Sequence, residues 1–141
     1  MVGLAAVHAC RLRGYFPDAR CGGGRRRWQA MARVAQRGEI WLVDLGLAAK
    51  VRPCLVLSIA FRDDERAVVT YVPRTTALRG GRFEVPHRAP RFQPGAFDVQ
   101  NINTVPVSRL INLLARVDDA TLDQIESALV VWLQVDREEF E

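Results

Sequence analysis

The sequence predicts a mainly β domain, built as a small barrel or strongly bent sheet with one C-terminal helix. Short apolar, β-prone segments recur between residues 39 and 105, and turn residues separate them about every 8 to 12 positions, as in small barrels. Residues 122–133 instead place apolar side chains three and four positions apart, which predicts an amphipathic helix. A chain of 141 residues suffices for one domain with a hydrophobic core.

The first 36 residues differ in composition from the remainder of the chain. They carry seven arginines and one aspartate. Three consecutive glycines are followed directly by three of these arginines. No strand or helix pattern is sustained there, so we expect residues 1–36 to form a basic, disordered extension, with Met31 as an alternative start. A basic arm that contacts nucleic acid is the other interpretation. The folded domain is then expected at residues 37–141.

The elements of that domain follow from local patterns. We expect strands at 39–45, 54–60, 67–76, 82–86 and 96–105, a short helix at 107–114 and a terminal helix at 122–133. Pro73 should end the regular pairing of its strand, because proline has no N–H to donate. Asp118 or Asp119 can cap the terminal helix and complement its dipole.

Composition excludes several classes of protein. No apolar run approaches the ~18 to 20 residues of a membrane span. Cys10, Cys21 and Cys54 are widely spaced and show no metal-binding pattern, which suits a reducing compartment, so we expect a cytoplasmic protein. Residues 50–116 are basic and residues 117–141 are acidic, which predicts an anionic partner on one face of the domain.

Arg52 is the residue that first suggests a site. It stands before Pro53 at the mouth of the apolar segment 54–60, and a residue that precedes proline is driven towards extended geometry. Thr75 and Thr76 end the next strand, with Arg74 beside them and Arg79 and Arg82 across a glycine turn; Gln100 and Asn101 lie in a later strand. An anion site and an ordinary solvated strand end are both compatible with these residues.

A phosphodiester is the anion that such residues suit. A guanidinium fork can hold two phosphate oxygens while a hydroxyl donates a third hydrogen bond. RNA brings its own nucleophile in the 2′-hydroxyl, so a site that orients sugar and phosphate in line could cleave RNA without a cofactor. We find no metal-ligand constellation, no nucleophile elbow and no phosphate-binding glycine loop, and His87 is expected to be a loop residue.

Ordered motifs in the chain resemble the MazF/PemK/Kid family of type II toxin–antitoxin toxins. The motifs are GEIWLVDLG, KVRPCLVLS, VVTYVPRTT, RFEVP and NINTVPVSRL, followed by the terminal helix, from about residue 38 to about residue 133. The resemblance implies an SH3-like β-barrel of the CcdB/MazF type that works as a homodimer. It implies a metal-independent, cofactor-free endoribonuclease that cuts single-stranded RNA, often mRNA, at short motifs. The products would be 2′,3′-cyclic phosphate and 5′-hydroxyl ends, and a cognate antitoxin would block the groove.

The resemblance also implies roles for individual residues. Arg52 matches the family's catalytic arginine; because its pKa exceeds ~12, we expect it to stabilise charge electrostatically, with proton donation to the leaving oxygen as a second role. Thr75 matches the threonine that contacts the scissile phosphate or positions the attacking hydroxyl. RNA contacts are expected from the residues around this pair, namely Lys50, Arg74, Thr76, Arg79, Arg82, Gln100 and Asn101.

Two departures from the family pattern bear on activity. The loop before Arg52 is short and has lost an acidic residue, with Lys50 near its place. Gln100 stands where some members have an aspartate proposed as the base, so the group that accepts the 2′-proton is left open. Two alternatives to the nuclease therefore remain: a non-catalytic CcdB-like inhibitor of a protein target such as gyrase, and a degenerate barrel that only binds RNA or an antitoxin.

Overall fold

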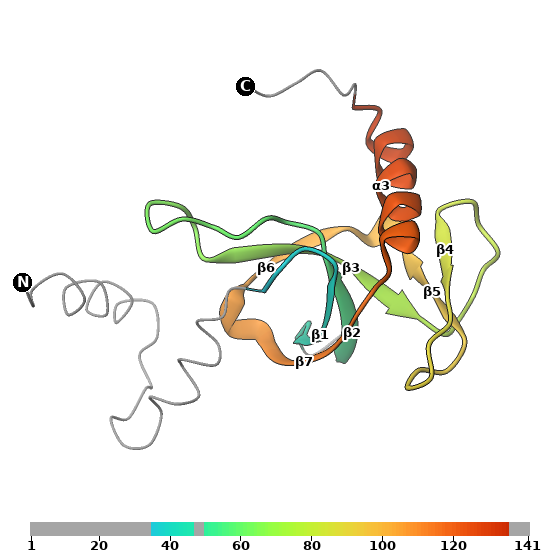
Figure 1. The fold of residues 1–141 in the computed structure, drawn as a ribbon, viewed down its shortest axis with the longest axis horizontal. Helices are drawn as coiled ribbons and strands as arrows, with labels where there is room; N and C mark the ends of the chain where they lie inside the picture. The colour runs from blue at the N-terminus through green and yellow to red at the C-terminus, as the bar shows by residue number, and fades with distance from the viewer. Residues whose placement is uncertain (1–34, 47–49, 136–141) are drawn as a thin grey trace, which may run out of the picture. The chain divides into compact units, whose positions relative to one another are not determined.

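The fold is an antiparallel, strongly bent sheet with one long helix packed against it (Figure 1). The computed structural model describes residues 35–46 and 50–135. The extension expected at residues 1–36 lies outside these ranges except for Ala35 and Gln36. Ala35 is only 2% exposed and packs in a core cluster, so the folded region reaches at least two residues beyond the expected boundary at residue 37.

The described ranges contain seven strands, two 3₁₀ turns and one α-helix. In chain order they are β1 (Glu39–Asp44), β2 (Val51–Val56), β3 (Val68–Thr75), β4 (Glu84–His87), β5 (Gly95–Asp98), η2 (Val99–Asn101), β6 (Asn103–Pro106), η3 (Val107–Arg109), β7 (Leu110–Arg116) and α3 (Asp119–Leu133). The expected fold class, a mainly β domain with a C-terminal helix, is confirmed.

Strand β3 is the centre of the sheet. The strands follow the order β4-β5-β3-β2-β1-β7, and β6 pairs with β3 as well. The first half of β3 pairs with β6, from Val68 to Tyr71, and its end pairs with β5, at Arg74 and Thr75. The other edge of β3 pairs with β2. Two register shifts in the pairing of β1 with β7 mark β-bulges, which bend a sheet and increase its twist.

Two expectations from the sequence are wrong in detail, and a third holds for one edge of β3. Residues 107–114 form η3 and most of β7 and not a helix, because the edge of β1 offers this segment a hydrogen-bonded partner that outweighs its local helical pattern. Residues 96–105 form β5, η2 and β6 and not one strand. Pro73 ends the regular pairing of β3 with β2, as expected, but β3 itself runs on to Thr75 and changes its outer partner around this residue.

Apolar side chains cover both faces of β2 and β3. Alternate residues face opposite sides of a strand, and this separates Leu55 and Val72 from Cys54 and Tyr71. The first core cluster comprises Ile40, Leu55, Leu57, Val72, Phe83, Val85, Phe97, Val99, Val117 and Ile125. The second core cluster comprises Ala35, Trp41, Val43, Cys54, Val56, Val69, Tyr71 and Leu110. Burial on both faces explains why these strands read as nearly continuous apolar runs.

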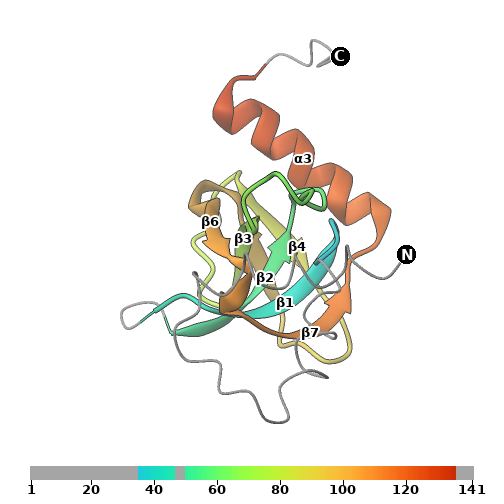
Figure 2. The same cartoon turned by 90° about the vertical axis from the view of Figure 1, so that its left-hand side faces the viewer.

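Helix α3 covers the first core cluster and runs across one end of the sheet, close to β4 and η2 (Figure 2). Asp118 is its N-cap residue, as expected, and Gln134 ends it in the left-handed conformation with a backbone bond from its N–H to the carbonyl of Val130. Ile125 is fully buried against the sheet. Arg37 also ties the helix to the start of β1 by donating hydrogen bonds to Glu126 and to the carbonyl of Leu57.

Replacing Ile125 by alanine should lower the free energy of unfolding by about 3 kcal/mol, because four buried carbon atoms are reduced to one in a packed core. The measurement is equilibrium unfolding in urea, followed by circular dichroism. Gln124→Ala, on the exposed side of the same helix turn, is the control and should change stability by less than about 0.5 kcal/mol. Equal effects of the two substitutions would contradict the docking of α3 described above.

Candidate functional site

The start of β2 and the end of β3 bring Arg52 and Thr75 to the same place. The two strands are antiparallel, and their last paired residues are Cys54 and Pro73. Continuing that register by two residues sets Arg52 opposite Thr75. Residues opposite each other in an antiparallel pair point to the same face, with Cβ atoms about 5 Å apart. The pair on which the sequence analysis rests therefore shares one face of two neighbouring strands.

Two prolines explain why the ladder between β2 and β3 ends at this point. The hydrogen-bonded ladder between β2 and β3 stops at Cys54 and Pro73, one residue short of Pro53. Proline has no N–H, so Pro53 and Pro73 cannot continue a regular ladder. The strand ends can then separate, which leaves room for a ligand between side chains that the register still aligns.

Arg52 is held from its backbone while its side chain is exposed. On the other edge of β2 it pairs with Val43 of β1, and its carbonyl accepts a hydrogen bond from the Cys54 thiol at 3.6 Å. Burial raises the pKa of Cys54 to about 12, and the positive charge of Arg52 opposes that rise. The guanidinium is thus close enough to Cys54 to act on it electrostatically, on the face of the second core cluster.

Thr75 is fixed by contacts on both sides. Its hydroxyl oxygen accepts a hydrogen bond of 3.1 Å from the N–H of Ala77, which leaves the hydroxyl proton to be donated elsewhere. Its backbone is approached so closely by Gly95 of β5 that a Cβ there would lie 2.5 Å from the carbonyl oxygen of Thr75. Thr76 is exposed and follows directly, in the bend after β3.

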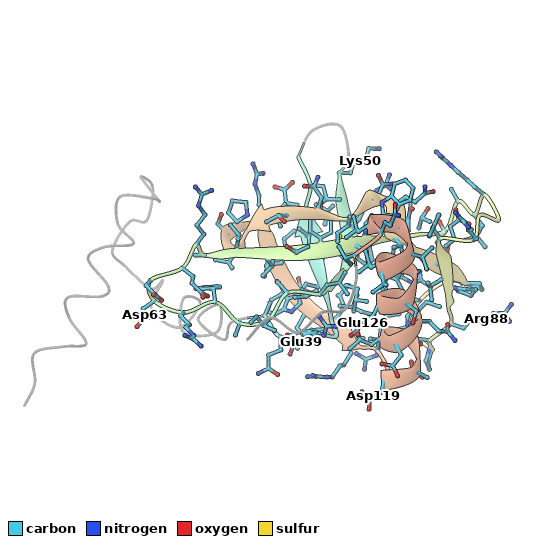
Figure 3. All side chains as sticks on the ribbon, turned by 90° about the horizontal axis from the view of Figure 1, so that it is seen from above. Glu39, Lys50, Asp63, Arg88, Asp119 and Glu126 are labelled. Atoms are coloured by element: carbon cyan, nitrogen blue, oxygen red, sulfur yellow. The ribbon has the colours of Figure 1, made fainter. Side chains whose placement is uncertain are left out.

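Lys50 lies two residues before Arg52, where the chain enters β2. Its N–H donates to the carbonyl of Gly46 at 2.9 Å, and both residues have positive φ, 59° for Lys50 and 90° for Gly46. Lys50 is exposed. Figure 3 shows Lys50 far from Asp63, which lies in the turn that follows β2. Lys50 therefore places a second positive charge at the end of the sheet where Arg52 lies.

Arg74 faces away from this pair and is almost fully buried, at 5% exposure. Its guanidinium donates to His87 Nδ1 at 2.9 Å and to the carbonyls of His87 and Gln93, and it lies 5.0 Å from the ring centroid of Phe92. Its donors join β3 to β4 and to the loop before β5. Arg74 therefore holds the sheet together. It is not exposed on a surface where RNA could reach it, contrary to the expectation from the sequence.

Arg79 and Arg82 lie in the turn between β3 and β4. The carboxylate of Glu84 accepts hydrogen bonds from the N–H groups of Arg79 and Gly80 at 2.9 to 3.0 Å and so closes the turn. The Arg82 guanidinium lies 4.6 Å from the ring centroid of Phe83, and Arg82 lines a shallow groove between β4 and α3. Both side chains are exposed, and no register aligns either one with Arg52.

Gln100 and Asn101 lie in η2, the 3₁₀ turn that separates β5 from β6. The two outer partners of β3 differ in register by three residues, and η2 takes up this difference. Both side chains are exposed, and the amide of Asn101 donates a hydrogen bond of 2.6 Å to the carboxylate of Asp98. The sequence analysis overlooked Asp98. The Asp-x-x-Asn spacing, typical of a turn closed by side chains, was the signal that could have found it.

These placements bring together a cation, a hydroxyl and an amide. Lys50 and Arg52 lie at the start of β2, next to the end of β3 that carries Thr75, and η2 adds polar groups near β3. Hydrogen-bond donors of these kinds suit a phosphate group. In the described part of the chain, no group of three or more His, Cys, Asp or Glu side chains could hold a metal ion. Helices long and apolar enough to cross a membrane are also lacking there.

The contact between Arg74 and His87 should make stability depend on pH. Burial and the charge of Arg74 lower the pKa of His87 below its ordinary value of 6.5, although Asp118 acts in the opposite direction. Below pH 6.5 this histidine therefore binds a proton more readily in the unfolded chain than in the folded one. Its contribution to stability is fully present above this pH and is lost as the pH drops below it. His87→Asn, which keeps an acceptor for Arg74, should flatten the dependence in urea titrations between pH 7.5 and 5.0.

The chain's other histidine provides the control for that measurement. His8→Asn should leave the pH dependence as it is in the wild-type protein. Equal slopes for His87→Asn and the wild type would contradict the proposed cause.

The Cys54 thiol should be inert in the folded protein. It is fully buried, and because its pKa is raised to about 12, almost none of it is the reactive thiolate at pH 8. Iodoacetamide at pH 8, followed by peptide mass spectrometry, should leave Cys54 unmodified in the native protein and label it after unfolding in urea. Rapid labelling of Cys54 in the native protein would show that the face behind Arg52 is open.

Comparison with known proteins identifies the family of this chain. Residues 36–133 match the model of the PemK-like, MazF-like toxins of type II toxin–antitoxin systems. Over 112 residues the chain is 32% identical to "Probable endoribonuclease MazF5" of Mycobacterium tuberculosis, a match that covers 76% of this chain and all of that protein. The matched region contains every described residue of the candidate site.

Solved structures agree with this result. An endoribonuclease from a mycobacterial species, solved in complex with its cognate antitoxin, is 28% identical with a TM-score of 0.63, covering 74% of this chain and 99% of that one. The Mycobacterium tuberculosis toxin MazF-mt6 is 27% identical with a TM-score of 0.61, covering 70% and 98%. The sequence match and the fold lead to the same conclusion: this chain belongs to the PemK-like, MazF-like toxin family of type II toxin–antitoxin systems.

Proposed function

We propose that this toxin is a metal-independent endoribonuclease that cleaves single-stranded RNA at the strand ends that carry Arg52 and Thr75. The observation that supports this most directly is the register of β2 with β3, which, continued two residues beyond Cys54 and Pro73, sets these two residues opposite each other on one face. Relatives named as endoribonucleases match the chain over nearly their whole length, which supports the same activity.

The proposed chemistry needs no group beyond the protein side chains and the RNA. The Arg52 guanidinium holds two oxygens of the scissile phosphate, and the Thr75 hydroxyl donates to the same group. The 2′-hydroxyl of the ribose attacks the phosphorus, and the 5′-oxygen leaves, which yields a 2′,3′-cyclic phosphate and a 5′-hydroxyl. As negative charge grows on the phosphate oxygens, both donors bind more tightly, and this difference accelerates the reaction.

A single strand suits a site of this shape. The sugar and phosphate must rotate into line for the 2′-oxygen to attack, and unpaired nucleotides can do so. Lys50 and Thr76, with Gln100 and Asn101 in η2, are the residues from which we expect contacts to the strand. Arg79 and Arg82 remain predictions of backbone contacts further along it. Arg74 leaves this set because its donors are already used within the sheet.

The partners follow from the same family. A cognate antitoxin is expected to cover the basic strand ends, since a related endoribonuclease has been solved in complex with its own antitoxin. We infer a cytoplasmic location, where RNA is the available substrate, and a homodimer as the working form. The homodimer rests on the resemblance to the family and would be tested by light scattering of the purified protein.

Replacing Arg52 by alanine should lower RNA cleavage by about 100- to 1,000-fold, the usual cost of removing one donor from a transition-state oxyanion. Arg52→Lys should recover only part of the activity, because an ammonium cannot form the bidentate fork. Thr75→Val should lose activity that Thr75→Ser keeps. Cleavage of mixed single-stranded RNA in EDTA, with identification of the new ends, is the measurement.

Arg62→Ala provides the matched control. It removes the same charge from an exposed arginine, but Arg62 lies in the turn beyond the opposite end of β2, so cleavage should be unchanged. Absence of cleavage by the wild-type protein would refute the nuclease. Tight RNA binding without new 5′-hydroxyl ends would favour the degenerate barrel, and growth arrest with intact RNA and broken DNA would favour the CcdB-like inhibitor.

A further inference from the structure

We propose that Asp98 is the base that accepts the 2′-hydroxyl proton in this protein, held in place by Asn101. This inference rests on the proposed endoribonuclease function and completes it. Gln100, at the position where some relatives have an aspartate, cannot take up a proton at neutral pH. The chain therefore needs another acceptor if it is to assist the attack.

The register of β5 places Asp98 on the same face as Thr75. Thr75 pairs with Ala96, and Arg74 pairs with Phe97. Phe97 is fully buried in the first core cluster, so Ala96 and Asp98 point the other way, to the side of Thr75 and Arg52. The backbone of Asp98 is still extended, with φ −89° and ψ 95°, so the alternation holds at this residue.

The spacing of this face brings the carboxylate within reach of the phosphate. Asp98 lies two residues from Ala96 and is thus the diagonal neighbour of Thr75 across the β3–β5 pair. Diagonal neighbours are about 7 to 8 Å apart, and their side chains can meet through a bound group. Asp98 is half-buried, so solvent and a ligand can still approach it.

Asn101 fixes the orientation of that carboxylate. Its side-chain amide donates to Asp98 Oδ2 at 2.6 Å, which occupies one carboxylate oxygen and leaves the other to accept a proton. The contact exists because η2 turns the chain back by one 3₁₀ turn directly after β5. Asn101 does not touch the reacting atoms in this scheme, so its role is that of a positioning residue.

Asp98 and Arg52 lie on opposite sides of Thr75. Arg52 comes from β2 on one edge of β3, and Asp98 comes from β5 on the other. In-line displacement at phosphorus places the attacking and leaving oxygens on opposite sides of the phosphate. When the scissile phosphate is held at Thr75, the attacking 2′-hydroxyl of the ribose would therefore face the carboxylate. The leaving 5′-oxygen would face the guanidinium. This arrangement separates the base from the cation that stabilises the leaving group.

Neighbouring carboxylates are already used. Glu84 pairs with Asp98 across β4 and β5, but both of its oxygens accept hydrogen bonds from the N–H groups of Arg79 and Gly80. Asp44, near the start of β2, accepts from the N–H of Gly46 and from Arg109. Asp98 differs from both, because its carboxylate accepts from the side-chain amide of Asn101 on the same turn.

The proposed step balances as follows. The Asp98 carboxylate takes the proton from the 2′-hydroxyl, and the 2′-oxygen forms its bond to phosphorus. The bond from phosphorus to the 5′-oxygen breaks, and that oxygen leaves with the electron pair and gains a proton from water or from Arg52. Asp98 then releases its proton to solvent, and the cyclic phosphate departs.

Two substrates and two variants test this assignment. The cleavage site of the wild-type protein is first mapped on mixed RNA, and an oligonucleotide with that site is made with oxygen or with sulfur at the bridging 5′-position. A thiolate leaves without a proton, so the sulfur substrate needs a base but not leaving-group assistance. Asp98→Asn should reduce kcat by about 100-fold on both substrates, whereas the defect of Arg52→Ala should shrink on the sulfur substrate.

Controls separate catalysis from folding and binding. Asp98→Asn keeps an acceptor for Asn101, and its thermal unfolding and its affinity for the oligonucleotide with a 2′-deoxy scissile ribose should match the wild type. Asp64→Asn, the same exchange in the exposed turn after β2, should cleave normally. Asn101→Ala should lower kcat, in addition to any rise in KM from a lost contact to the strand, and adding it to Asp98→Asn should lower kcat no further, because the two act as one unit.

Each outcome decides between the two proposals. A wild-type protein that does not cleave RNA would overturn the nuclease together with this inference. A wild type that cleaves, beside an Asp98→Asn variant within threefold of it, would overturn the base alone. A defect of Asp98→Asn that disappears on the sulfur substrate would also overturn it, because the carboxylate would then act on the leaving oxygen.

Discussion

The antiparallel pairing of β2 with β3 is the interaction on which the site depends. Cys54 opposite Pro73 sets a register that carries Arg52 to Thr75 two residues later. A shift of one residue would send one of these side chains to the opposite face, because strand side chains alternate with a period of two. Apolar burial on both faces of the two strands makes such a shift costly, so the core that stabilises the sheet also maintains the geometry of the site.

The change of partner along β3 supplies the remaining polar groups. β6 and β5 pair with successive parts of the same strand edge in registers that differ by three residues. The chain takes up the difference in η2, which exposes Gln100 and Asn101 and turns Asn101 back onto Asp98. An irregularity that would weaken an ordinary sheet thus gathers near β3 side chains that a continuous strand would have spread along its length.

Local patterns were enough to predict the strands up to residue 86 and the terminal helix, whereas the roles of Arg52 and Thr75 come from the resemblance to the family and stay predictions. They failed where partners distant in the sequence decide the structure. Residues 110–116 join the edge of β1, and the segment after Asp98 breaks because β3 demands two registers; neither partner is visible in a local window. Asp98 was missed for the same reason, since only the pairing of β5 with β3 shows which face it shares.

Arg52 and Arg74 show how position decides what the same side chain does. Arg74 precedes Thr75 by one residue and therefore faces the first core cluster, where His87, Gln93 and Phe92 surround its guanidinium. Arg52 lies on the other face at an opened strand end, where burial is slight and an incoming phosphate can reach it. Removing Arg74 would leave buried acceptors without a partner, so its cost falls on folding. Arg52 belongs to neither core cluster, so under the proposed mechanism the cost of removing it falls on the chemistry.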